Sequence, residues 1–211
     1  MTPGNFTYRF VPGASERTLL LLHGTGGNEE SLLPVGQALD PGAALLSPRG
    51  QVLEGTMPRF FRRLAEGVFD QEDLRLRTDA LAAFLGRQVA ERGLDPAGVT
   101  AVGFSNGANI AASLLLRYPG LLAQAILWRA MVPFEPAEPR GLSGTRVLLG
   151  EGRYDPIVPV TNAERLAQLL RTAGAEVTLD WREAGHQLQQ GEVEAAKAWL
   201  AGQRRSDSLR P

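Results

Sequence analysis

The chain has 211 residues, no cysteine and a formal net charge of −1 at pH 7. Without cysteine it has no disulfide, no thiolate chemistry and no zinc or iron–sulfur site held by cysteine. A charge this close to zero marks neither nucleic acid nor an anionic membrane as a partner. The length, together with 44% hydrophobic residues, is typical of one globular domain over residues 1–211.

The sequence shows no segment that is expected to insert into a membrane. Residues 1–10 lack a basic region followed by a long apolar run, which is the pattern of a signal peptide. The apolar run at residues 19–22 is far too short to span a bilayer. We therefore expect a cytoplasmic protein without stable membrane insertion.

Short apolar runs alternate with longer amphipathic segments, and this order predicts strands alternating with helices. We expect strands at residues 6–11, 18–22, 43–47, 99–104, 125–128, 147–149 and 177–181. We expect helices at residues 31–39, 72–92, 106–118, 162–173 and 192–200. Ser31 is the expected N-cap of the first helix, and Gly93 ends the second. Residues 48–70 read as irregular, and residues 203–211 as a loose tail.

Alternating strands and helices favour an α/β fold, in which helices cover both faces of a mostly parallel sheet. Ligands of such sheets bind beyond the carboxyl ends of the strands. The residues that follow the predicted strands are therefore the first place to look for chemistry.

A Gly-x-Ser-x-Gly sequence occupies residues 103–107, between the strand predicted at 99–104 and the helix predicted at 106–118. A nucleophile elbow must lie at such a junction, because its strained turn lifts a serine hydroxyl above the sheet edge. The pentapeptide alone is a weak signal, and a plain glycine-rich turn is the alternative. The position between strand and helix favours Ser105 as a nucleophile.

A serine nucleophile needs a base, and the chain offers only two histidines. His186 follows the last predicted strand, where a loop can place an imidazole over the elbow. His23 follows an early strand, in the sequence His-Gly-Thr-Gly-Gly, and suits the shaping of an oxyanion loop better than proton transfer. A hydrogen-bonded structural role is the alternative for either histidine. We expect His186 to be the general base.

The acid that orients the histidine should lie between the elbow and His186 in the chain. Asp155 meets this condition in the loop after the strand at 147–149, and Pro156 stiffens that loop. Glu151 is the competing carboxylate, and a turn aspartate before proline is the structural alternative. The order Ser105, Asp155, His186 is the order of α/β-hydrolases.

An oxyanion hole needs two backbone N–H donors. We expect one from Asn106, directly after the nucleophile, and the other from Thr25 in the glycine-rich loop after His23. A phosphate-cradling loop is the alternative for that segment, but no Gly-Lys-Ser/Thr sequence follows it.

Several apolar residues lie in segments that should ring the elbow, where they would form an acyl or aromatic-alcohol pocket. Each is equally compatible with a place in the core. These residues are Phe60, Phe61, Trp128, Met131, Val132 and Ile157. The neighbouring Arg59, Arg62 and Arg63 would suit an acidic substrate, but a solvated loop face is the favoured interpretation.

The chain resembles the phospholipase/carboxylesterase branch of the α/β-hydrolases, which includes bacterial carboxylesterases and acyl-protein thioesterases. It is most similar to small bacterial esterases associated with hydroquinone-resistance operons, over about residues 5–200. The likeness is carried by residues 22–29 (LHGTGGNE), 47–50 (SPRG), 57–63 (MPRFFRR), 103–109 (GFSNGAN), 154–159 (YDPIVP) and 185–186 (GH).

The resemblance implies a fold with a minimal lid or none, and an esterase that needs no metal or cofactor and acts on small to medium acyl esters. It also implies oxyanion amides from Thr25 and Asn106, and a homodimer. Acyl-protein thioesterases usually carry Gln after the nucleophile, where this chain has Asn106, so a thioesterase or lysophospholipase-type activity stays an alternative. A catalytically silent binding module is the non-enzymatic alternative.

Overall fold

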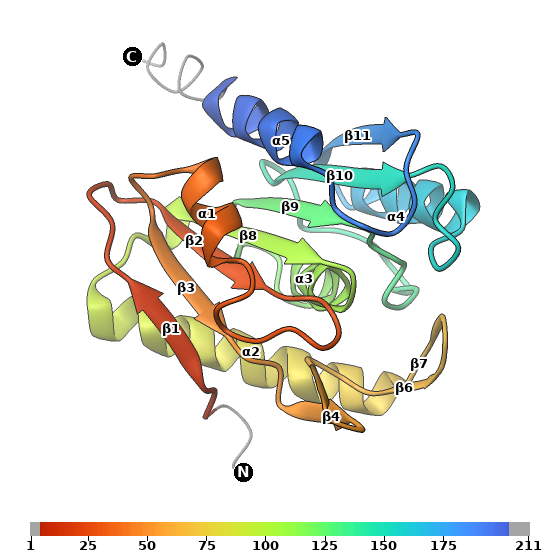
Figure 1. Ribbon diagram of the computed structural model, residues 1–211, viewed down its shortest axis with the longest axis horizontal. Helices are drawn as coiled ribbons and strands as arrows, with labels where there is room; N and C mark the ends of the chain where they lie inside the picture. Colours follow the sequence, from red (N-terminus) through yellow and green to blue (C-terminus); the bar gives the residue numbers. More distant parts are fainter. Residues whose placement is uncertain (1–4, 203–211) are drawn as a thin grey trace.

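The computed structural model describes residues 5–202, so the tail predicted from residue 203 lies outside the described part. One seven-stranded sheet runs through the molecule in the order β1-β3-β2-β8-β9-β10-β11 (Figure 1). Its strands are β1 (Tyr8–Val11), β2 (Thr18–Leu22), β3 (Ala44–Pro48), β8 (Val99–Phe104), β9 (Gln124–Trp128), β10 (Arg146–Gly152) and β11 (Glu176–Arg182). β1 pairs antiparallel with β3, and every other pair in this sheet is parallel. The predicted fold class is confirmed.

Helices cover both faces of the sheet (Figure 1). They are α1 (Leu33–Leu39), α2 (Gln71–Arg92), α3 (Asn106–Arg117), α4 (Val160–Thr172) and α5 (Gln190–Gly202), with a 3₁₀ turn at Pro96–Gly98. α1 and α5 contact each other over one face, while α2, α3 and α4 pack on the other. Within residues 5–202, none of these helices combines the length and the apolar character that crossing a bilayer requires.

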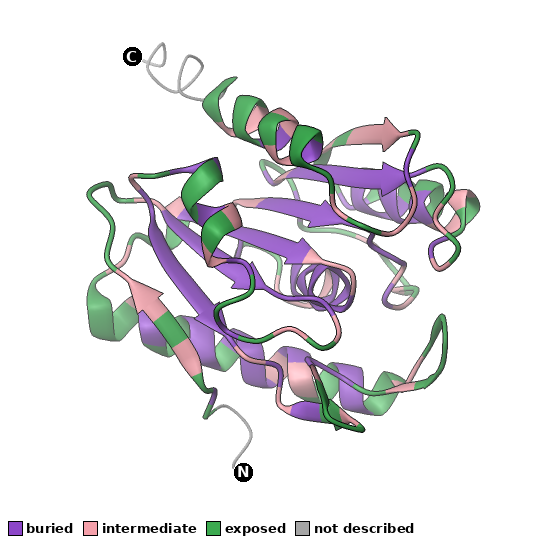
Figure 2. Ribbon diagram, viewed as in Figure 1, coloured by how far each residue is buried: buried purple, intermediate pink, exposed green. Residues whose placement is uncertain are grey.

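The central strands are largely apolar because the sheet is covered on both sides there. All five residues of β2 are buried, and its side chains alternate between the two faces. Leu20 and Leu22 join the core beneath α2 and α3, whereas Leu19 and Leu21 join the core beneath α1 and α5. Figure 2 shows the central strands buried along most of their length.

Of the two helix ends predicted from the sequence, the end of α2 agrees with the structure and the start of α1 does not. The side chain of Asp70 accepts a hydrogen bond from the Asp73 N–H at the start of α2, and Gly93 ends that helix with a φ of 62°. Helix α1 begins at Leu33, and the expected cap by Ser31 is wrong. The Ser31 hydroxyl instead accepts a hydrogen bond from the N–H of Asn28, so it closes the preceding turn.

Residues 48–70, expected to be irregular, contain two short antiparallel hairpins. They are β4 (Val52–Glu54) with β5 (Met57–Arg59), and β6 (Arg63–Ala65) with β7 (Val68–Phe69). Gly55 and Gly67 turn the two hairpins with positive φ values of 62° and 72°. Strands of two or three residues are too short to show a periodic pattern, which is why the sequence did not reveal them.

Candidate active site

Ser105 lies in a strained turn between β8 and α3, with φ 52° and ψ −116°. Its N–H donates to the carbonyl of Trp128 on the neighbouring strand, 2.8 Å away. A Cβ at position 107 would stand 1.9 Å from the Leu22 carbonyl oxygen, so only glycine lets α3 start this close to β2. Sequence and packing together produce the geometry of a nucleophile elbow.

Ser105, His186 and Asp155 meet at the carboxyl ends of β8, β11 and β10. The Ser105 Oγ is 2.9 Å from His186 Nε2, and His186 Nδ1 is 2.8 Å from Asp155 Oδ2. A carboxylate only accepts hydrogen bonds, so the proton belongs on Nδ1, and Nε2 is left as an acceptor for the serine hydroxyl. The three side chains thus form a continuous chain of hydrogen bonds, in which the imidazole can accept the hydroxyl proton.

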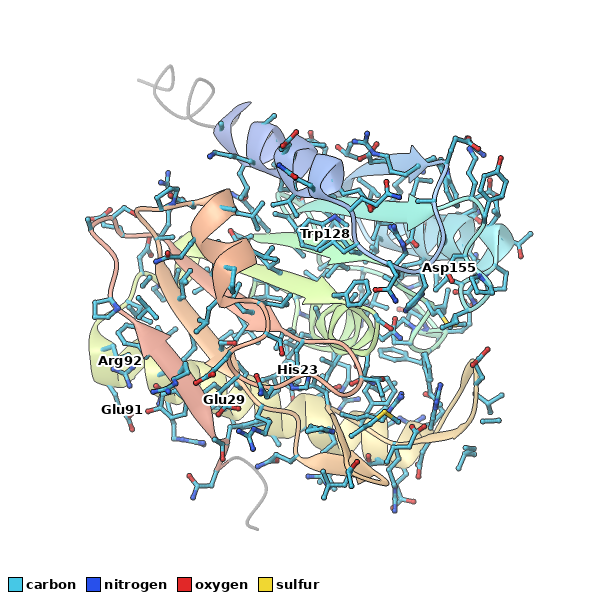
Figure 3. All side chains as sticks on the ribbon, viewed as in Figure 1. His23, Glu29, Glu91, Arg92, Trp128 and Asp155 are labelled. Atoms are coloured by element: carbon cyan, nitrogen blue, oxygen red, sulfur yellow. The ribbon has the colours of Figure 1, made fainter. Side chains whose placement is uncertain are left out.

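Asp155, which is labelled in Figure 3, is held in place by its own loop as well as by the histidine. Its side chain is 0% exposed, and its Oδ1 accepts hydrogen bonds from the N–H groups of Ile157 and Val158 at 2.7 and 3.1 Å. Asp155 therefore keeps one oxygen for the backbone and the other for His186. The competing carboxylate, Glu151, makes no hydrogen bond to His186 among the described residues.

The amides of Thr25 and Asn106 are free to act as donors, because neither makes a backbone hydrogen bond in the described part of the chain. Both residues line the cavity that contains Ser105. Three contacts fix them to the segment around β5. The Gly26 N–H donates to the Pro58 carbonyl at 2.9 Å, and the Thr25 hydroxyl accepts from Arg59 Nη1 at 2.8 Å. The Asn106 side-chain oxygen accepts from the Phe60 N–H at 2.7 Å.

His23, which is labelled in Figure 3, is fully occupied by hydrogen bonds to backbone groups. Its Nδ1 lies 2.7 Å from the Gly24 carbonyl oxygen, and its Nε2 accepts the N–H of Gly50 at 3.0 Å. Burial lowers the pKa of His23 below its ordinary value of 6.5. A neutral imidazole with both nitrogens bonded shapes the loop that carries Thr25 and has no nitrogen left for proton transfer.

A cavity of about 360 Å³ opens beside Ser105. Its lining residues are Thr25, Arg59, Arg63, Glu66, Gly67, Phe69, Phe104, Ser105, Asn106, Asn109, Met131, Ile157, His186 and Gln187. Met131 and Ile157 were predicted from the sequence, whereas Phe69 and Phe104 were missed. No separate lid domain is seen over the cavity within residues 5–202; the short β6–β7 hairpin edges it instead.

The other predicted pocket residues lie elsewhere. Phe60 packs against the His23 ring at 4.7 Å, and Phe61 lies behind Phe69, with ring centroids 5.1 Å apart. Trp128 is buried in the core beneath α1 and α5, on the sheet face away from α3. Val132 packs against the opposite core. The expectation for these four residues is corrected: Phe60, Phe61 and Trp128 are buried core side chains, and Val132 is partly buried against the core.

The sequence favours a solvated loop face for Arg59, Arg62 and Arg63, and the structure differs for two of them. Arg59 is 4% exposed and Arg63 28% exposed, and both line the cavity. Only Arg62, 62% exposed and 3.1 Å from Asp70, lies on a solvated face. A solvated loop is therefore the wrong description of Arg59 and Arg63.

A completely buried arginine, Arg129, braces the loop that carries His186, and sequence reasoning missed it. All five of its N–H bonds find acceptors: the carbonyls of Gly185, Gly150 and Gln187, at 2.9, 3.0 and 3.1 Å, and both carboxylate oxygens of Glu192, at 2.6 and 2.8 Å. Its Nε is also 3.8 Å from Asp155 Oδ2. The available signal was a charged residue inside the apolar run at residues 125–132.

The chain is similar to known proteins in both sequence and structure. A model of the phospholipase/carboxylesterase family matches residues 12–203. The putative hydrolase MhqD of Bacillus subtilis is 49% identical over 190 residues, which are 90% of this chain and 95% of that protein. The crystal structure of the Bacillus cereus carboxylesterase matches with a TM-score of 0.92 and 48% identity, covering 94% of each chain. That of a carboxylesterase from Mesorhizobium loti matches with a TM-score of 0.90 and 32% identity, covering 96% of this chain and 97% of the other.

Proposed function

Because the chain belongs to the phospholipase/carboxylesterase family, we propose that it is a serine carboxylesterase that uses Ser105, His186 and Asp155 as its catalytic residues. Its substrates are small-molecule esters with small to medium acyl groups. The observation that carries the proposal is the unbroken hydrogen-bonded path from Asp155 through His186 to the Ser105 hydroxyl. Its end lies in a cavity large enough for a small ester.

Acylation follows from this geometry. His186 Nε2 takes the proton from the Ser105 hydroxyl as Oγ attacks the carbonyl carbon of the ester. Asp155 stabilises the imidazolium that forms, because it accepts the Nδ1–H at 2.8 Å. The same proton is then given to the leaving alcohol, so the step ends with an acyl-Ser105 ester and a neutral imidazole. A water molecule, activated in the same way, releases the acid.

The negative charge of each tetrahedral intermediate develops on the former carbonyl oxygen. The N–H groups of Thr25 and Asn106 are the donors for it, and the positive end of the α3 dipole adds to their effect. Donors that are already fixed in place need no reorganisation during the reaction. The contacts from Pro58, Arg59 and Phe60 to the two loops serve this purpose.

Replacing Ser105 by alanine tests the proposal. We expect Ser105→Ala to lose at least about a thousandfold in kcat on p-nitrophenyl butanoate, because the nucleophile is gone. Ser143→Ala, which removes a hydroxyl from an exposed turn outside the cavity, is the matched control and should keep the wild-type rate. Wild-type rates in the Ser105→Ala protein would disprove the proposal. A wild-type protein that hydrolyses no ester or thioester would favour a binding module.

A further inference from the structure

Two arginines form one wall of the cavity that contains Ser105, and they share a single carboxylate. Arg63 and Arg59 both contact Glu54, at 2.6 and 3.2 Å. We propose that this wall, defined by Arg59 and Arg63, binds a carboxylate of the substrate, so that the preferred esters carry an anionic group. The inference rests on the proposed function, because the same cavity holds both the ester and its carboxylate.

Each arginine keeps N–H groups that no described residue uses. Arg63 donates from Nε and Nη2 to the two oxygens of Glu54, at 3.0 and 2.6 Å, and its Nη1 has no partner within residues 5–202. Arg59 donates from Nε to the Phe61 carbonyl and from Nη1 to the Thr25 hydroxyl, and its Nη2 is likewise without a partner in that range. Neither nitrogen is among the fully buried atoms without a partner, so each keeps some contact with solvent.

The charge at the wall is incompletely compensated. Both oxygens of Glu54 are engaged by Arg63, and the contact from Arg59 is the longer one. Burial, and secondly the positive charge of Arg63, lower the pKa of Arg59 below its ordinary value. A charge held out of water in this way gains most from a further anionic partner. A substrate carboxylate would be that partner.

The wall is also rigid and close to the reacting groups. The Arg59 side chain is almost completely buried, and its hydrogen bond to Thr25 joins it to the loop that carries a proposed oxyanion amide. A planar guanidinium fixed by several bonds matches the geometry of a carboxylate and loses little freedom on binding. An ester carrying a carboxylate would thus be held at two points, its carbonyl by the amides and its anionic end by the arginines.

One acidic residue opposes this preference. Glu66, in the turn of the β6–β7 hairpin, lines the same cavity, is exposed and makes no ion pair among the described residues. Its negative charge should repel an anionic substrate. Removing the charge of Glu66 should therefore raise the preference for an anionic substrate, whereas removing Arg63 should lower it. These opposite effects test the proposal.

The measurement is a ratio of kcat/KM values for matched esters. On the acyl side, p-nitrophenyl hydrogen adipate is compared with p-nitrophenyl hexanoate. On the alcohol side, 4-acetoxybenzoate is compared with its methyl ester. We expect the wild-type protein to prefer the anionic member of one pair, and that pair shows which side of the ester carries the carboxylate. Arg63→Gln should lower the preference about tenfold, since a charge-assisted hydrogen bond is lost.

Three further variants serve as controls. Arg62→Gln removes the same charge one residue away but outside the cavity, so it should leave the ratio unchanged. Arg63→Lys keeps the charge and should retain part of the preference, provided that its melting temperature shows a folded protein. Glu66→Gln should raise the preference. An equal ratio in the wild type and in Arg63→Gln for both pairs would overturn the proposal.

Failure of the subsite and failure of the esterase can be told apart. Calorimetry of adipate binding to the Ser105→Ala protein needs no catalysis, and we expect binding that the added Arg63→Gln substitution weakens about tenfold. Ester hydrolysis without adipate binding and without an anionic preference would overturn the subsite alone. Adipate binding to a protein that hydrolyses no ester would overturn the esterase alone.

Discussion

Arg129 and Glu192 form a two-bond ion pair from which solvent is excluded, directly behind the loop that carries His186. The guanidinium and the carboxylate meet at 2.6 and 2.8 Å, and their side chains are 0% and 1% exposed. The same carboxylate accepts the N–H of Gln189 at 3.0 Å. The pair therefore joins the end of β9 and the start of α5 to both backbone neighbours of the histidine.

Removing one partner of this ion pair should destabilise the folded protein. We expect Glu192→Leu to lower the free energy of unfolding by about 3 to 5 kcal/mol, because Arg129 is left as an unpaired buried charge. Urea unfolding followed by circular dichroism measures the loss. The double variant Arg129→Met/Glu192→Leu should recover most of the stability but not the wild-type kcat. The carbonyls of Gly185 and Gln187 would still lack their donor, so the histidine loop would be less well fixed. Full recovery of both quantities would contradict this role of Arg129.

The buried carboxyl group of Glu151 should make the stability of the protein depend on pH. One of its oxygens accepts the Ala130 N–H at 3.0 Å, while the other is buried and has no partner among the described residues. Burial raises the pKa of Glu151 well above its ordinary value of 4.5. As the pH rises above 4.5, the unfolded chain loses this proton while the folded chain keeps it, so stability falls until the raised pKa is passed.

Glu151→Gln removes that titration and keeps the acceptor for Ala130. The variant should be about as stable as the wild type near pH 4.5 and more stable than it at pH 8, by urea unfolding at both values. Glu164→Gln, a change on the exposed face of α4, is the control and should show no such divergence. A difference between Glu151→Gln and the wild type that is the same at both pH values would refute the assignment.

Ile157 lines the cavity and Trp128 lies in the core, so their replacement should change substrate binding and stability, respectively. Ile157→Ala should raise KM for p-nitrophenyl hexanoate severalfold, because Ile157 lines the cavity while its amide still supports Asp155. Trp128→Ala should leave KM nearly unchanged and lower the free energy of unfolding by about 3 to 5 kcal/mol, as expected for a large core side chain. A changed KM in the Trp128 variant with unchanged stability would show that Trp128 contacts the substrate and would contradict this assignment.

Much of the fold was predictable because its signals are local. The central strands are largely apolar runs, and Gly93 and the glycines of the elbow mark turns. The family expected from the sequence is confirmed. The places of Ser105, Asp155 and His186 follow from one rule: each comes just after a strand, and the carboxyl ends of parallel strands share one edge of the sheet.

The remaining features depend on contacts between distant segments. Whether Trp128 faces the cavity or the core changes with a shift of one residue along β9, and composition does not fix that register. The role of Arg129 depends on its ion pair with Glu192, which is 63 residues further along the chain. The burial of Arg59 likewise depends on the hairpins of residues 52–69, whose strands are too short to leave a pattern.

The central claim is that His186 activates Ser105 as a nucleophile, and labelling with a fluorophosphonate probe tests it most directly. Peptide mapping by mass spectrometry should find the phosphonyl group on Ser105 of the wild-type protein. His186→Asn should slow labelling by at least about a hundredfold, because the general base is lost. An adduct on another residue, or labelling of the His186→Asn protein at the wild-type rate, would contradict the account.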